Sequence, residues 1–277
     1  MTKSIAFQGE PGAYSHEACL KARPGMEALP CRAFEDVVDA VRSGAAELAM
    51  LPVENTTYGR VADIHSMLPQ SGLHIIDEAF VRVEICLMAR PGVTLDQVRH
   101  VRAHMVLLPQ ARTFLRQHGI TSEAAADSAG AAAALAEHDG SMDGVMASAV
   151  AAEIYGLDIL AHGIEDQDTN TTRFLIMSRA DDKTRRGEHG MITSFVFQVR
   201  NIPAALYKAM GGFATNGINM TKLESYMVNG SFTATQFYAD IEGHPDDPAV
   251  RRALEELDFF TTNVKILGVY PAAAKHH

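Results

Sequence analysis

The chain has 277 residues, which favours two modules of unequal size over one average domain or three. Apolar residues make up 47% of it and charged residues 21%, a composition that argues against an intrinsically disordered protein. The net charge is -10 and no lysine or arginine cluster exceeds a neighbouring pair, so we expect no nucleic-acid partner.

The first part of the chain alternates short apolar runs with amphipathic helical segments, the rhythm of an α/β fold. The pattern predicts a strand at 5–7, helices at 14–22 and 34–43, a buried strand at 48–53 and a helix that begins near Val61. In the second helix one apolar stripe faces the core, formed by Phe34, Val37, Val38 and Val41.

The middle of the chain is interpreted as a second lobe. A strand-rich stretch runs from 74 to 88, and helical and strand segments follow to about Leu160, including an alanine-rich helix at 129–137. A polar loop then leads into an apolar strand at 174–177, a junction that favours a functional site. The charged, aperiodic residues 178–190 mark a domain boundary.

The remaining pattern predicts a ferredoxin-like βαββαβ order. Pro203 is expected at a first helical position, Asn216-Gly217 at the end of that helix, and Asn229-Gly230 between two strands. The expected elements are a strand at 192–199, a helix at 203–215, strands at 218–227 and 232–241, a helix at 248–258 and a strand at 264–269.

Three cysteines without CxxC spacing predict neither a disulfide framework nor a zinc site, and they suit a reducing cytosol. The N-terminus has no signal-peptide pattern and no apolar run approaches about 18 residues, so we expect a cytoplasmic protein with no membrane partner. His276-His277 are either native or the stub of a tag, and no prediction of fold or function rests on them.

Three polar segments are candidates for a site. Residues 9–16 join a strand to a helix, where free N–H groups suit either a carboxylate or a purely structural turn, while Glu10 opposes a pyrophosphate. Residues 52–59 gather a carboxylate, an amide and hydroxyls, which suit either ligand binding or helix capping.

The third segment is Thr172-Arg173-Phe174 at a strand start. Alternation places Thr172 and Phe174 on one face and Arg173 on the other. Arg173 then either binds a substrate carboxylate or braces an internal acid, with Glu54, Glu165 and Asp168 as the options.

No metal or cofactor is expected from the sequence. His100 and His104 have a metal-compatible spacing, but no carboxylate completes a ligand set. Because no nucleophile motif and no nucleotide-binding loop appears, the residues alone indicate an anion-binding α/β enzyme or receptor.

Taken together, Gly9-Glu10-Pro11-Gly12-Ala13-Tyr14-Ser15-His16, Pro52-Val53-Glu54-Asn55-Thr56-Thr57-Tyr58-Gly59 and Asn170-Thr171-Thr172-Arg173-Phe174 resemble the prephenate dehydratase family in order and spacing. The resemblance implies a catalytic region at 1–179 built like a type-II periplasmic binding protein, with one lobe at about 1–78 and 160–179 and the other at about 79–159. It also implies a linker at 180–189, an ACT regulatory domain at 190–271, and a homodimer or homotetramer.

The implied reaction converts prephenate to phenylpyruvate, carbon dioxide and water in phenylalanine biosynthesis, without a cofactor. The essential threonine of the family falls on Thr172, which we assign to the departing hydroxyl. Relatives often have His-Pro-Gln where this chain has His104-Met105-Val106, followed later by Gln110. The expected substrate contacts are Ser15, Glu54, Asn55, Thr56, Gly59, His104, Ser128, Asn170, Arg173 and Phe174.

In the ACT part, the resemblance implies inhibition by L-phenylalanine. The expected effector site comprises Ile202, Pro203, Ala204, Ala205 and Leu206 with Leu223, Glu224 and Ser225, and Ala204, Tyr226 and Met227 depart from the usual pattern of the family. Two alternatives stay open: dehydratase activity on arogenate, and a non-catalytic amino-acid-binding sensor.

Overall fold

The computed structural model describes residues 3–138, 143–182, 184–227 and 234–273. The chain forms two compact units. Unit 1 contains residues 1–60 and 80–174, and unit 2 contains residues 61–79 and 175–277. Strands β5 (His74–Arg82) and β11 (Thr171–Ser178) each run from one unit into the other.

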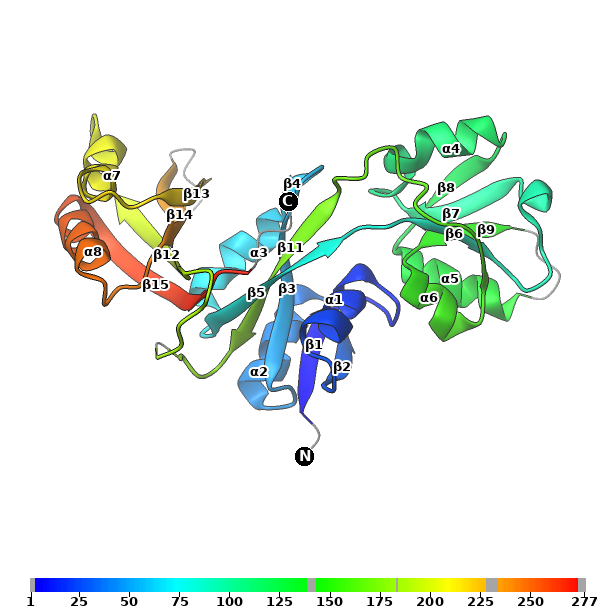
Figure 1. Ribbon diagram of the computed structural model, residues 1–277, viewed down its shortest axis with the longest axis horizontal. Coiled ribbons are helices and arrows are strands. Elements are labelled where there is room, and N and C mark those ends of the chain that lie inside the picture. Colours follow the sequence, from blue (N-terminus) through cyan, green and yellow to red (C-terminus); the bar gives the residue numbers. More distant parts are fainter. Residues whose placement is uncertain (1–2, 139–142, 183, 228–233, 274–277) are drawn as a thin grey trace. The chain divides into compact units, whose positions relative to one another are not determined.

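Unit 1 has two lobes, and the first is built on a parallel sheet (Figure 1). β1 lies between β2 and β3, with Phe7 paired to Pro30 on one side and Met50 on the other. Of the predicted stripe of the second helix, Val37, Val38 and Val41 are buried and Phe34 is half-buried. The elements are β1 (Ser4–Gln8), α1 (Tyr14–Ala22), β2 (Glu27–Cys31), α2 (Phe34–Ser43), β3 (Leu48–Asn55) and β4 (Gly59–Arg60), which pairs with β3.

The second lobe is a five-stranded sheet in the order β10-β6-β9-β7-β8. On β6, Leu87 belongs to one apolar cluster and Cys86 to another, because successive side chains point to opposite faces. The elements are β6 (Cys86–Ala89), η2 (Leu95–Gln97), β7 (His100–His104), η3 (Leu108–Ala111), α4 (Arg112–Gln117), β8 (Thr121–Ala125), α5 (Ser128–Glu137), β9 (Gly144–Ala147), α6 (Ala149–Tyr155) and β10 (Asp158–Ala161).

Both lobes use the same strand arrangement. β1 is flanked by β2 and β3 in parallel, and β7 is flanked by β8 and β9 in parallel. Two chain segments connect the lobes, one between β5 and β6 and one between β10 and β11. The predicted two-lobed, type-II periplasmic-binding-protein-like class of this region is confirmed.

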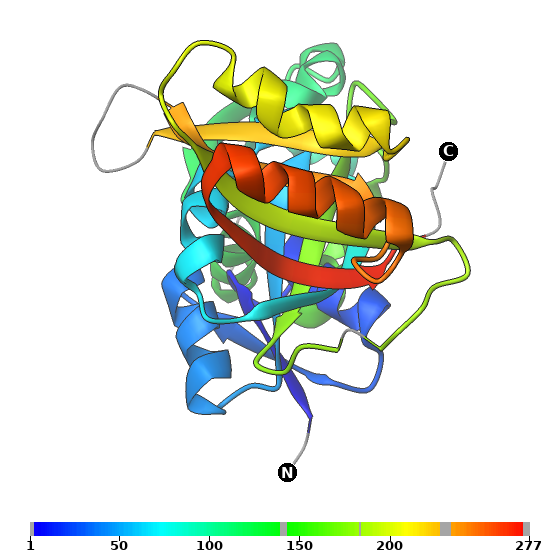
Figure 2. The ribbon, with the colours of Figure 1, turned by 90° about the vertical axis from the view of Figure 1, so that its left-hand side faces the viewer.

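Unit 2 has the predicted βαββαβ order, which confirms the ferredoxin-like module. α7 and α8 lie side by side on one face of its strands (Figure 2) and bury Phe213 and Leu257 against Phe195. Gly268 pairs with Ile75 so closely that a Cβ would lie 2.1 Å from the Ile75 carbonyl oxygen. The elements are α3 (Ala62–Met67), η1 (Leu68–Gln70), β12 (Met191–Val199), α7 (Ala205–Thr215), β13 (Met220–Met227), β14 (Ala234–Glu242), α8 (Pro248–Phe260) and β15 (Thr261–Pro271).

One helix start was predicted wrongly. α7 begins at Ala205 rather than at Pro203, because Ala204 adopts a left-handed conformation (φ 61°) that cannot continue a right-handed helix. The predicted turn at Asn229-Gly230 lies outside the described residues. None of the described helices is long and apolar enough to cross a membrane.

Candidate active site

Two of the predicted polar segments lie at the carboxyl ends of parallel strands of the first lobe, 9–16 after β1 and 52–59 at the end of β3, which is the edge where α/β sheets bind ligands. The third, 170–174, begins β11 beside the end of β3. The turn after β1 touches the second lobe there: Ser148 Oγ donates to the Gly12 carbonyl at 2.6 Å, and Tyr155 Oη donates to the Pro11 carbonyl at 2.8 Å. Gly12 has a φ of +92°, and a Cβ would lie 2.8 Å from Ala151 Cα, so only glycine fits this contact between lobes.

A directional chain of side-chain amides crosses from the first lobe to the second. Asn55 Oδ1 accepts from two backbone N–H groups, those of Thr57 at 2.8 Å and Tyr58 at 3.0 Å. These two donors fix which end of the amide is oxygen, so Asn55 Nδ2 must face the site. It donates to Asn170 Oδ1 at 2.7 Å and to Thr172 Oγ1 at 2.9 Å.

The chain continues in the same direction into the second lobe. Asn170 Nδ2 donates to Gln110 Oε1, and Gln110 Nε2 donates to the Val106 carbonyl at 2.8 Å. Tyr58 Oη donates to the same carbonyl at 2.5 Å. Asn170 and Gln110 are buried, so each amide needs the partners that it has here.

This chain determines the orientation of the Thr172 hydroxyl. Because Asn55 Nδ2 can only donate, Thr172 Oγ1 must accept, which leaves the hydroxyl hydrogen available for another acceptor. Among the described residues, no further hydrogen bond of this hydroxyl occurs. The Thr172 hydroxyl is therefore already oriented as a hydrogen-bond donor for a bound ligand.

Arg173 lies on the opposite face of β11, as alternation predicts, and contacts an acid on β3. Its Nη1 lies 2.9 Å from Glu54 Oε1, so of the alternatives left open by the sequence the structure forms the bracing pair with Glu54. Glu165 instead pairs with Arg82 at 3.1 Å. Phe174 was expected to contact the substrate, but its side chain is 1% exposed and packs in the core of the sheet, so it is not available to a ligand.

The turn after β3 is locked to the start of β11. Thr56 N donates to the Thr171 carbonyl, Thr171 N donates to Thr56 Oγ1, and Thr56 Oγ1 donates to the Thr169 carbonyl, each at 2.9 Å. Gly59 completes the turn with a φ of +78°. Asn55, Thr56, Gly59, Asn170 and Thr172 are thus brought together at this turn, while Glu54 and Arg173 pair on the opposite face of β11.

The other predicted contacts lie at neighbouring strand ends. Ser15 stands half-buried in the first turn of α1. The His104 N–H donates to Ser128 Oγ at 2.9 Å, which joins the end of β7 to the start of α5. The sequence pattern gave no role to Gln110 and did not point to Ser148, because only the fold brings these two side chains to the site.

His100 and His104 do not form a metal pair. They lie at opposite ends of β7, about 13 Å apart at the usual rise of a strand, and His100 contacts Thr121 and Glu123 instead. Within the described residues, the side chains with metal-binding atoms that do gather are Glu84, Cys86 and His162.

The two predicted effector segments lie at the same end of unit 2. Gln198, at the end of β12, and Tyr226, at the end of β13, both pair with Gln236 of β14. Ala205 is buried in the same apolar cluster against which Leu206 and Leu223 pack, whereas Ile202, Pro203, Ala204 and Ser225 are exposed and Glu224 is half-buried. A helix start beside a strand end offers donors for a carboxylate.

We expect the substitution Ala204→Gly to stabilise the protein. A left-handed L-residue costs about 1–2 kcal/mol, whereas the extra freedom of glycine in the unfolded chain costs about 0.4–1 kcal/mol, so a net gain of about 0.5–1 kcal/mol remains. Thermal unfolding should show a Tm raised by a few degrees. Ala214→Gly, at an exposed position inside the same helix, should lower the stability by about 1 kcal/mol; equal effects of the two changes would contradict the strain at Ala204.

The fold and the site define a class of two-lobed α/β protein with polar donors gathered at strand ends, joined to a ferredoxin-like module. Residues 5–182 match the family model of prephenate dehydratase, and the chain belongs to this family.

Two curated relatives and one solved structure are similar to nearly the whole chain. A bifunctional N-acyl-homoserine lactone acylase/prephenate dehydratase of Komagataeibacter europaeus is 51% identical, over 97% of this chain and 96% of the relative. The arogenate dehydratase/prephenate dehydratase 1 of Arabidopsis thaliana is 38% identical, over 96% of this chain and 71% of the relative. The prephenate dehydratase of Arthrobacter aurescens, solved in complex with L-Phe, is 28% identical with a TM-score of 0.88, covering 98% of this chain and 90% of the other.

Proposed function

We propose that this protein converts prephenate to phenylpyruvate, carbon dioxide and water, as a step of phenylalanine biosynthesis. The bond between the ring and its carboxylate breaks, the electron pair moves through the ring, and the ring hydroxyl leaves and takes up a proton from solvent to become water. The observation that carries this proposal is the Thr172 hydroxyl, which accepts from Asn55 and keeps its own hydrogen for the leaving oxygen.

Thr172 contributes by hydrogen bonding rather than by proton transfer. Negative charge develops on the leaving oxygen in the transition state, so a fixed donor stabilises the transition state more than the substrate. A donor that is already oriented needs no reorganisation, and such a group contributes about 3–4 kcal/mol. No covalent intermediate is required, which agrees with a site made of amides and hydroxyls.

The remaining predicted residues complete the proposal. Ser15, His104 and Ser128 lie at the strand ends of the two lobes and are suited to the two carboxylates of the substrate. Thr56 contributes by holding the turn, because its N–H and its hydroxyl already donate to the Thr171 and Thr169 carbonyls. Arg173 acts through its pair with Glu54, by holding the strand that carries Thr172. In this proposal residues 1–179 form the catalytic region, 180–189 a linker and 190–271 the regulatory domain. The protein is a cytoplasmic homodimer or homotetramer.

L-Phenylalanine is the proposed effector of the ACT module. The relative from Arthrobacter aurescens was solved with L-Phe, and the predicted effector segments of this chain lie at one end of unit 2. Regulation requires that phenylalanine bind one state better than another. Calorimetry should detect binding, and turnover should fall when phenylalanine is present; neither effect would be seen if the effector assignment is wrong.

Two other substrates have a specific reason to be tested. Arogenate is the second candidate because the Arabidopsis relative acts, by its name, on arogenate as well. N-acyl-homoserine lactone is the third, because the 51% identical relative carries an acylase activity in its name.

The deciding experiment incubates the purified protein with each substrate separately. We expect phenylpyruvate from prephenate at a higher kcat/KM than phenylalanine from arogenate. A reversed preference would make arogenate the substrate, and no product from either would refute the dehydratase proposal. Hydrolysis of the amide bond of N-acyl-homoserine lactone, which releases the fatty acid and homoserine lactone, would belong to a separate activity if it persists in Thr172→Val.

A further inference from the structure

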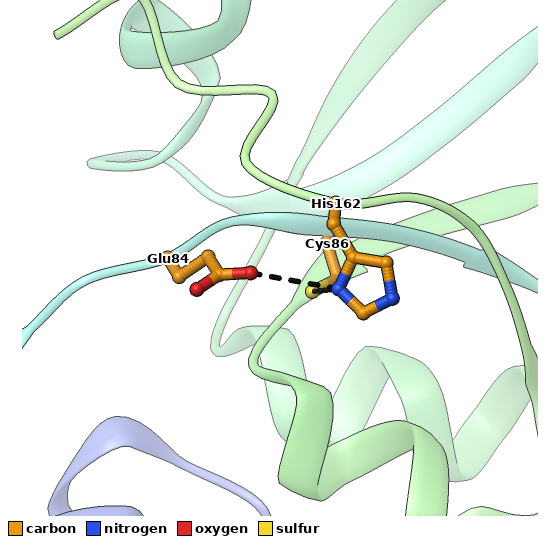
Figure 3. A group of neighbouring side chains, drawn as sticks. All are labelled: Glu84, Cys86 and His162. Atoms are coloured by element: carbon orange, nitrogen blue, oxygen red, sulfur yellow. Dashed lines mark hydrogen bonds and ion pairs between the residues drawn. The ribbon is translucent and has the colours of Figure 1, made fainter. Parts of the chain in front are cut away.

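Glu84, Cys86 and His162 come together from the two segments that connect the lobes of unit 1 (Figure 3). Glu84 lies between β5 and β6, Cys86 is the first residue of β6, and His162 follows β10 directly. The dehydratase site uses none of these side chains. Their grouping depends on the fold alone, because His162 is 76 residues from Cys86.

The spacing of their ligand atoms is that of a tetrahedral metal site. Cys86 Sγ and Glu84 Oε1 each lie 3.5 Å from His162 Nδ1, and the three residues offer atoms that all lie within 4.8 Å of one another. Zinc bonds of about 2.3 Å to sulfur and about 2.0 Å to nitrogen and oxygen give tetrahedral edges of about 3.5 Å for sulfur to nitrogen and about 3.3 Å for nitrogen to oxygen. The remaining distance, between the Glu84 carboxylate and Cys86 Sγ, can shorten because the Glu84 side chain is exposed.

The surroundings of the thiol are buried and acidic. Burial raises the pKa of Cys86 to about 11, and the carboxylates of Glu84, Glu165 and Glu17 add to the effect. Arg82 and Lys21 pair with Glu165 and Glu17, which leaves Glu84 beside His162. The same surroundings disfavour a free thiolate nucleophile, because no lysine or arginine side chain touches the sulfur among the described residues.

We propose that Glu84, Cys86 and His162 bind a thiophilic divalent cation, with Zn²⁺ as the best match, and that this ion fastens the two connecting segments to each other. Sulfur, imidazole nitrogen and carboxylate oxygen together suit Zn²⁺ better than Mg²⁺ or Ca²⁺. Binding replaces the thiol proton, which is released to solvent, and water fills the fourth position.

The ion would reinforce contacts that already exist between the segments. The Ile164 N–H donates to the Ile85 carbonyl at 3.0 Å, and the Ile85 N–H donates to Glu165 Oε2 at 2.9 Å. Both bonds must break before the segments separate, so a bound metal should slow the hydrogen exchange of these two amides.

Cobalt titration of the full-length, chelator-treated protein tests the site, because a thiolate bound to Co²⁺ absorbs strongly in the near ultraviolet. The wild type and Cys31→Ser, a control at a half-buried thiol of β2, should both develop this band at one equivalent. Cys86→Ser should lose the band. A band that never appears, or that persists in Cys86→Ser, would overturn the proposal.

A second variant keeps the test decisive if Cys86→Ser does not fold. The His162 side chain is 62% exposed, so His162→Ala should fold normally and bind Co²⁺ at least about tenfold more weakly. Zn²⁺ should slow exchange at Ile85 and Ile164 in the wild type but not in His162→Ala. Unchanged affinity or unchanged exchange protection in this variant would refute the site.

Discussion

Replacing Thr172 with valine should lower kcat for prephenate by roughly 10²- to 10³-fold with little change in KM, the loss expected for one preorganised donor to a developing oxyanion. Valine keeps the shape of threonine and removes only the hydroxyl, so the sheet should remain intact. Steady-state kinetics of the purified variant, with circular dichroism as a check on folding, measure the effect.

Two further variants distinguish the loss of the hydroxyl from a disturbance of side-chain packing. Thr172→Ser keeps the hydroxyl and should retain most of the activity. Thr171→Val makes the same change one position earlier, where only the backbone N–H and carbonyl hold the turn, and kcat should change little. If Thr172→Val turned over at a near-normal rate, the hydroxyl would have no part in the reaction.

The substitution Asn55→Asp tests the direction of the amide chain. The new carboxylate keeps an oxygen for the two backbone donors but cannot itself donate, so Thr172 would turn its hydrogen toward this carboxylate and away from the substrate. We expect kcat to fall by about 10²-fold, close to the loss in Thr172→Val, and the unfolding free energy to fall by about 1–3 kcal/mol because Asn170 Oδ1 loses its donor.

The charge-matched control is Asn170→Asp. It places the same charge close by, but Asn55 can still donate both to an oxygen of the new carboxylate and to Thr172, so kcat should fall less than in Asn55→Asp. Equal losses in the two variants would mean that charge, and not hydroxyl orientation, controls turnover. Combining Asn55→Asp with Thr172→Val should add little, because both remove the same hydrogen bond to the leaving oxygen.

Local pattern predicted the helices of the first lobe well. α1 and α2 match their predicted ranges, since the apolar spacing is regular and Gly44 ends α2 with a φ of 86°. β2 was not predicted because none of its residues is fully buried, it shows no alternation and it contains Pro30; its pairing with β1 makes it a strand. α7 was misplaced because the backbone at Ala204 departs from what alanine prefers.

The site was predictable only in part. The resemblance pointed to Thr172 and Asn55, and strand alternation placed Arg173 on the other face, but nothing in the pattern distinguished Glu54 from the other acids as its partner. Gln110 reaches the site only because Asn170 lies between the lobes. Contacts that join distant segments depend on strand order, which local periodicity does not contain.

The hydrogen bonds between Thr56 and Thr171 also affect the rate at which the preceding asparagines deamidate. Spontaneous deamidation of asparagine begins when the backbone nitrogen of the next residue attacks the side-chain carbonyl carbon. Asn55 and Asn170 are each followed by a threonine whose N–H is already bonded, Thr56 to the Thr171 carbonyl and Thr171 to Thr56 Oγ1. These hydrogen bonds should slow deamidation at both positions, and loss of the Thr56 hydroxyl should speed it at Asn170, where it frees the Thr171 N–H.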